Sequence, residues 1–183
     1  MNLIYIIVVF LLTLSSCISS VRWGRVAQRE HYIPGYVTKF YFRWVRLVPF
    51  NNLYFFFCLV LIISSLWSPF PAIILAVVTL FTPVGLSFQY RTSKVSMTQR
   101  LKRLNLTYYL LLIIISTVSI YMDLGYFLAM LANLFSFYVY DQSLRITKGY
   151  EKNTSQKFID DAEDELKNFQ GPIVAITGSY SKT

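Results

Sequence analysis

The chain has 183 residues, of which 55% are hydrophobic and 14% are charged, and its mean hydropathy is positive. This composition excludes an ordinary soluble domain as the main part of the chain and predicts a protein whose chief solvent is lipid. The net charge of +8 does not indicate nucleic-acid binding, because the Lys and Arg residues flank apolar stretches, where anionic lipid headgroups are the nearer partner.

Five apolar stretches are long enough to cross a hydrocarbon core, which needs roughly 20 residues of helix and at least about 17. They cover approximately residues 3–21, 50–67, 70–88, 106–122 and 124–140. We therefore expect an all-α polytopic membrane protein with about five transmembrane helices. Only Ser68 and Pro69 separate the second stretch from the third, and only Asp123 separates the fourth from the fifth, so each pair predicts a tight hairpin.

The first stretch also fits, loosely, a lipoprotein signal peptide, because residues 14–17 read Leu-Ser-Ser-Cys. A signal peptide begins with a positively charged region, however, and residues 1–10 contain no charge. We therefore favour an uncleaved helix. Cys17 and Cys58 both lie in apolar runs and indicate neither a disulfide framework nor a metal site.

All Lys and Arg residues fall on one side of a five-helix arrangement. They lie in the loop after the first stretch, in the loop after the third, and after the fifth; the hairpin turns contain none. Because cationic loops are retained on the cytoplasmic side, this pattern predicts a multi-pass protein of the cell inner (cytoplasmic) membrane, with its N-terminus outside and its C-terminus in the cytoplasm. No Lys, Arg, Glu or His lies deep in a predicted span, which counts against a transporter or a pump.

Within the first cationic loop, aromatic residues alternate with Arg and Lys from Tyr36 to Arg46. Such a segment can lie in the membrane interface with its aromatic side chains turned inward and its cations turned toward lipid phosphates. His31 is the only histidine, and no partner residues are spaced to build a metal site or a catalytic triad on it. We therefore interpret this loop as a juxtamembrane anchor.

Residues 1–150 thus form the predicted transmembrane domain, and residues 151–170 an amphipathic linker helix. Asn153 or Thr154 can cap this helix, and apolar residues recur at helical spacing from Phe158 to Phe169, so we expect the helix to run to about Asn168. The acidic residues between them are expected to form a solvated face rather than a metal site.

Residues 171–183 predict the start of an α/β domain, which the chain leaves incomplete. Gly171-Pro172 breaks the helix, and residues 173–177 are a short β-branched run of the type buried as a strand. The strand leads into a loop made of Gly178, Ser179, Tyr180, Ser181, Lys182 and Thr183. A strand followed by a Gly-containing loop that ends in Lys and Thr is the layout of a phosphate-binding loop: backbone N–H groups surround the phosphate oxygens, the Lys reaches the outer phosphates, and the Thr hydroxyl binds Mg²⁺.

Residues 171–183 also resemble the entrance to the ATP-binding central domain of the Mur ligases, which form amide bonds in peptidoglycan assembly. Their loop commonly reads Thr-Gly-Ser-x-Gly-Lys-Thr, and the matching residues here are Thr177, Gly178, Ser179, Lys182 and Thr183. Within that family, the chain is most similar to the D-alanyl-D-alanine-adding ligases, in particular to membrane-attached bacterial versions. Residues 28–35 are similar to the first cytoplasmic loop of those proteins.

The resemblance implies ATP and Mg²⁺ as cofactors and a UDP-linked muramoyl peptide as substrate. It assigns residues 178–180 to the backbone cradle, Lys182 to the ATP phosphates and Thr183 to the metal. Ser181 departs from the family pattern, which has Gly at that position. If the loop needs a positive φ there, a residue with a Cβ atom is strained and crowds the phosphate, so we expect weakened nucleotide binding.

Mur-type ligation activates a carboxylate as an acyl phosphate that an amine then attacks, which requires further metal ligands, substrate contacts and a closing domain. We therefore expect the membrane-anchored N-terminal portion of such a ligase, inactive as this fragment and without catalytic residues of its own. The alternative is a non-enzymatic polytopic scaffold or assembly protein whose phosphate loop matches by chance or by decay. A third hypothesis, lipid transport by the helices, rests on fold alone.

Overall fold

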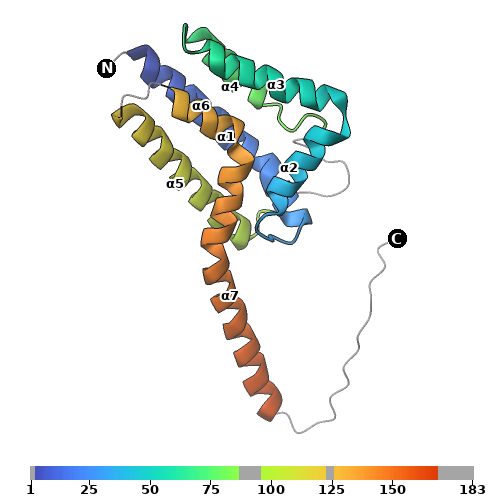
Figure 1. The fold of residues 1–183 in the computed structure, drawn as a ribbon. Coiled ribbons are helices and arrows are strands. Elements are labelled where there is room, and N and C mark those ends of the chain that lie inside the picture. The colour runs from blue at the N-terminus through green and yellow to red at the C-terminus, as the bar shows by residue number, and fades with distance from the viewer. Residues whose placement is uncertain (1–2, 87–95, 123–125, 169–183) are drawn as a thin grey trace. The chain divides into compact units, whose positions relative to one another are not determined.

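The computed structural model describes residues 3–86, 96–122 and 126–168, and the regular secondary structure among these residues consists of helices joined by turns and short loops (Figure 1). The helices are α1 (Leu3–Arg29), α2 (Tyr36–Leu47), α3 (Pro49–Ser64), α4 (Phe70–Thr79), α5 (Gln99–Tyr121), α6 (Phe127–Leu134) and α7 (Ser136–Asn168). The chain divides into two compact units, Met1–Lys148 and Gly149–Thr183.

Two helices of the described residues, α1 and α5, are long and apolar enough to cross a membrane. Helices α2 and α3 add a third span only if the two are taken together, and their axes are bent by 109° at the break between them. The prediction of about five transmembrane helices is therefore wrong. Two of the five apolar stretches form long uninterrupted helices. The second and third form the shorter helices α3 and α4, and the fifth is divided between α6 and the start of α7.

The shortening has identifiable causes in two of these three stretches. Helix α3 has 16 residues and ends ahead of Pro69, and α4 has 10 residues and ends ahead of Pro83. Proline lacks the backbone N–H that a helix interior requires, and its ring disfavours helical geometry in the preceding residue. In the fifth stretch, α6 has only 8 residues and gives way to α7 at Phe135, where no proline or glycine accounts for the break.

The structure also corrects the α/β part of the predicted fold class, because no strand occurs in residues 3–86, 96–122 or 126–168. The predicted strand at 173–177 and the predicted phosphate loop at 178–183 lie outside the described residues.

In the first unit, α1 packs against α4, α5 and α6 (Figure 1). A hydrogen bond from a polar side chain joins α1 to each of the three. Ser15 Oγ donates to the Ala76 carbonyl of α4 at 2.6 Å, and Thr13 Oγ1 shares a hydrogen bond with Ser116 Oγ of α5 at 2.6 Å. Asn133 Nδ2 of α6 donates to the Leu12 carbonyl at 2.9 Å. Small polar residues let helices approach closely and can join them within an apolar environment. The serine-rich part of α1 therefore lies inside the bundle rather than on its surface.

Gly24 brings α1 close to α5 and α7. A Cβ atom at this position would lie 3.1 Å from Leu101 Cδ1 and 3.1 Å from the Tyr140 hydroxyl oxygen. That hydroxyl donates a hydrogen bond to Asn105 Oδ1 at 2.7 Å, so the space beside Gly24 is already filled by a fixed ring. A larger side chain would separate the three helices.

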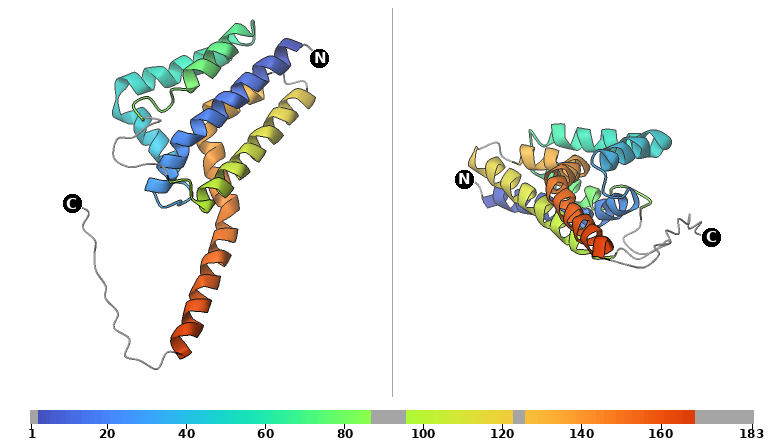
Figure 2. Two further views of the ribbon diagram at one scale, coloured as in Figure 1. Left: turned by 180° about the vertical axis from the view of Figure 1, so that it is seen from behind. Right: turned by 90° about the horizontal axis from the view of Figure 1, so that it is seen from below.

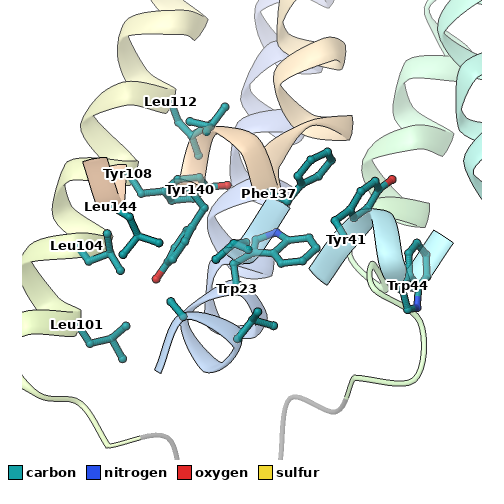
Figure 3. Packing of buried hydrophobic residues seen from close by; sticks show 14 residues of the cluster. Trp23, Tyr41, Trp44, Leu101, Leu104, Tyr108, Leu112, Phe137, Tyr140 and Leu144 are labelled. Carbon is teal, nitrogen blue, oxygen red and sulfur yellow. The ribbon is translucent and has the colours of Figure 1, made fainter. Parts of the chain in front are cut away.

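An aromatic cluster joins α1, α2 and α7 (Figure 3). Trp23 is fully buried, and its Nε1 donates to Ser136 Oγ at 3.2 Å. The rings of Tyr41 and Phe137 stack with their centroids 3.8 Å apart, and both rings lie edge-on to Trp23. This cluster fixes α2 against the rest of the first unit.

In the second unit, the described residues belong to the continuation of α7 to Asn168. The predicted helix start at Asn153 or Thr154 is wrong, because α7 passes through both residues without interruption. The Thr154 hydroxyl donates to the Tyr150 carbonyl one turn earlier, at 3.0 Å, and so does not cap a new helix. Phe158, Ile159 and Leu166 are exposed in this unit.

Candidate functional site

The six residues of the predicted phosphate loop, Gly178 to Thr183, lie outside the described residues. The ATP and Mg²⁺ sites assigned to them therefore stay predictions. Among the residues that the structure describes, no group of three or more His, Cys, Asp or Glu side chains could hold a metal ion. His31 is exposed and adopts a left-handed backbone conformation, with a φ of 53°.

The described cations of the first unit gather at one end of its helices (Figure 1 and Figure 2). They lie in the C-terminal turns of α1, along α2, in the first two turns of α5 and in α7. The opposite end comprises the start of α1, the turn between α3 and α4, and the end of α5. It carries no Lys or Arg among its described residues. The first unit is thus electrically polarised along its helices.

Helix α2 is the most clearly amphipathic element at the cationic end. Its buried side chains are Val37, Tyr41 and Trp44. Its cations are Lys39, Arg43 and Arg46, and all three are exposed. Both sets follow the spacing i, i+4, i+7, which places each set in one row on its own side of the helix. We call the row of Lys39, Arg43 and Arg46 the cationic ridge.

Apolar side chains border the cationic ridge on both sides. By helical position, Phe42 lies on one side and Leu47 on the other, and they are 47% and 67% exposed. The Lys39 ammonium lies 4.8 Å from the centre of the Tyr36 ring, a cation–π contact. The outer face of α2 therefore combines positive charge with exposed apolar and aromatic groups, as a segment in the membrane interface does.

The sharp corner between α2 and α3 sets the direction of the ridge. Val48 is extended, with φ −135° and ψ 129°, and Pro49 begins α3 at a position where its missing N–H is not needed. Buried Asn51 donates from Nδ2 to the Trp44 carbonyl at 2.8 Å, and Trp44 Nε1 donates to the Val84 carbonyl at 3.0 Å. These bonds hold the axis of α2 at its steep angle to the axis of α3.

The start of α2 is held by a residue from a distant helix. Gly35 has a φ of 91° and provides no side chain to cap the helix. Instead, the backbone N–H of Gly35 donates to Asp141 Oδ1 at 2.8 Å, and that of Thr38 donates to Oδ2 at 3.2 Å. The Thr38 hydroxyl also donates to Oδ2. Asp141 belongs to α7 and is 1% exposed, so a buried carboxylate satisfies two N–H groups at the start of α2 and interacts favourably with the positive end of the helix dipole.

Comparison with family models, with curated proteins and with solved structures finds no match for this chain. The resemblance of residues 171–183 to the Mur ligases therefore rests on the motif alone.

The described residues with a clear chemical capacity are therefore the cations at the cationic end. Exposed guanidinium and ammonium groups there can bind phosphate oxygens through charge-assisted hydrogen bonds. Sequence reasoning placed the aromatic residues of the 36–46 segment on one side and its cations on the other. The structure buries Tyr41 and Trp44 on the side away from the cations but leaves Tyr36 and Phe42 exposed beside them. Sequence reasoning missed Asp141, because a cap supplied by a residue 106 positions away leaves no local signal.

Proposed function

We propose that the first unit is a membrane-embedded helical module whose cationic end faces the cytoplasm. In this proposal, the module holds the residues that follow it, including the phosphate loop, on the cytoplasmic side of the inner membrane. There the chain serves as the membrane anchor of an ATP-dependent ligase of the Mur type, which adds D-alanyl-D-alanine to a UDP-linked muramoyl peptide.

The observation that carries the proposal is the gathering of Lys and Arg at one end of helices that are otherwise apolar. Cations next to membrane spans are retained in the cytoplasm, where ATP and UDP-linked precursors are also found. Helix α7 begins within the first unit and continues past Lys148 into the second, so it is the segment that joins the module to the residues that follow. The ligase part of the proposal is supported by the match of Thr177, Gly178, Ser179, Lys182 and Thr183 to the Mur loop.

A second candidate function is a non-enzymatic membrane scaffold. Ser181 favours it, because this residue stands where the Mur loop has glycine and where a Cβ atom is expected to crowd a phosphate. A scaffold would keep the membrane module and its orientation but would not bind nucleotide. ATP binding therefore separates the two candidates.

Nucleotide binding is tested on the full chain in lipid nanodiscs with labelled ATP and Mg²⁺. We expect Lys182→Ala to weaken binding about tenfold or more, since it removes a charge-assisted bond to phosphate. Ser181→Gly should strengthen binding by relieving the crowding, and Lys167→Ala, an exposed lysine of α7, should leave it unchanged. Equal binding by wild type and Lys182→Ala would contradict the phosphate loop and favour the scaffold.

Orientation is tested at the two ends of α5. In a chain whose native cysteines are replaced, single cysteines are placed at Gln99 and Tyr121, the exposed first and last residues of this helix. We expect a membrane-impermeant maleimide to label Tyr121→Cys in intact cells, and Gln99→Cys only after permeabilisation, because Gln99 lies at the cationic end. The reverse labelling pattern would place the cationic end outside and contradict the proposal.

A further inference from the structure

We infer that the cationic ridge of α2 binds the phosphate groups of anionic phospholipids, with the helix lying in the plane of the headgroups. This inference rests on the proposed placement of the cationic end at a membrane surface. It does not depend on nucleotide binding or on the ligase hypothesis.

The geometry of the ridge suits a row of phosphates. Lys39, Arg43 and Arg46 lie one turn apart in succession, and seven residues of helix at about 1.5 Å per residue make a row of roughly 10 Å. Arg presents paired N–H donors that match two phosphate oxygens, whereas Lys acts as a point charge. The ridge therefore offers several cations to neighbouring headgroups rather than one isolated charge.

The ridge cannot turn away from the surface, because the opposite side of α2 is locked into the protein. Val37 and Tyr41 are fully buried, and Tyr41 stacks on Phe137 of α7. The carboxylate of Asp141 fixes the first turn of the helix. The 109° bend then sets α2 across the direction of α3, which carries an apolar surface. If α3 lies along the membrane normal, α2 lies close to the membrane plane.

The apolar residues beside the ridge favour lipid over a soluble acidic partner or a nucleic acid. Phe42 on one side of the ridge is exposed, and so are Leu47 on its other side and Val48 and Phe50 at the corner and the start of α3. A polyanion bound from water would leave these side chains hydrated. A bilayer accommodates both features, because the apolar groups enter the boundary of the acyl chains while the cations meet the phosphates.

The test measures lipid selectivity of the full chain reconstituted in phosphatidylcholine bilayers that contain phosphatidylglycerol at roughly one lipid in three. Electron spin resonance of spin-labelled lipids gives the association constant of phosphatidylglycerol relative to phosphatidylcholine. We expect wild type to prefer phosphatidylglycerol. The triple variant Lys39→Gln, Arg43→Gln, Arg46→Gln should lose most of that preference, since each cation near an anionic surface contributes about fivefold.

Two matched variants isolate the ridge. Lys152→Gln, Lys157→Gln, Lys167→Gln removes the same charge from the second unit and should retain the wild-type preference. Lys39→Arg, Arg43→Lys, Arg46→Lys exchanges the side chains but keeps the charge, and should also retain it. An unchanged preference in the glutamine ridge variant, or an equal loss in the second-unit variant, would overturn the inference. So would a wild type that does not discriminate between the two lipids.

The outcome is separable from that of the proposed function. Both leaflets of the reconstituted bilayer have the same composition, so the selectivity does not depend on which end of the module faces the cytoplasm. It also does not involve residues 178–183. A chain that binds no ATP but prefers phosphatidylglycerol through the ridge would refute the ligase anchor and leave this inference standing.

Discussion

Replacing Trp23 with alanine is expected to lower the free energy of unfolding of the first unit by roughly 3–5 kcal/mol. The Trp23 ring is fully buried between α1, α2 and α7, where it meets Tyr41 and Phe137 edge-on (Figure 3). Its removal leaves a cavity that helices fixed on every side cannot fill, and it leaves Ser136 Oγ without the bond from the indole N–H. Unfolding of the detergent-solubilised full chain, followed by circular dichroism, measures the loss.

Trp67 provides the matched control for this substitution. It is 80% exposed, in the turn between α3 and α4, so Trp67→Ala removes the same side chain without opening a cavity. We expect a change within about 0.5 kcal/mol in detergent. Similar losses from the two substitutions would mean that the aromatic cluster does not stabilise the first unit.

The sequence carries enough information to predict α1 and α5, because each is a long apolar run without a proline. It also predicts the one-sided placement of the cations, since their order along the chain alternates with the apolar runs. The amphipathic character of α2 can be predicted because Tyr41 and Trp44 are three residues apart, as are Arg43 and Arg46, so each pair lies on its own side of a helix. These features are local, and local patterns are visible in one sequence.

The number of spans could not be predicted in the same way. A count of apolar residues measures affinity for lipid but does not measure where a helix stops. Pro83 shortens the third stretch, and its effect could have been anticipated. The break at Phe135 could not, because it separates α6 from α7 in a run of apolar and aromatic residues that contains no helix breaker.

The site was predictable only in part, because it depends on contacts between residues that are far apart in the sequence. The spacing of Lys39, Arg43 and Arg46 is visible in the sequence, but the side of α2 that faces outward depends on Tyr41 being covered by Phe137, nearly a hundred residues further along the chain. In the sequence, Asp141 directly follows the fifth apolar stretch. Its contact with the start of α2 joins residues 106 positions apart, and no periodic pattern encodes it.

Replacing Asp141 with alanine is expected to destabilise the first unit by roughly 2–4 kcal/mol. The carboxylate accepts hydrogen bonds from the backbone N–H groups of Gly35 and Thr38 and from the Thr38 hydroxyl, and it is buried. Its loss leaves these half-buried donors without their acceptor, which costs more than the bonds contribute when they are present. Asp141→Asn retains one acceptor oxygen without the charge, so the stability of this variant should lie between those of Asp141→Ala and wild type.

The same substitution should also loosen the segment that joins α1 to α2. Gly35 adopts a left-handed conformation at the end of this segment, and the bond to Asp141 holds it there. We therefore expect faster trypsin cleavage after Arg29 and Lys39 in Asp141→Ala than in wild type, together with a weaker preference for phosphatidylglycerol, because an unfixed α2 no longer presents its ridge in one direction. Asp160→Ala, on the exposed part of α7, serves as the control and should change neither property. An Asp141→Ala chain that is less stable but keeps the full lipid preference would show that the ridge acts without a fixed helix, by charge alone.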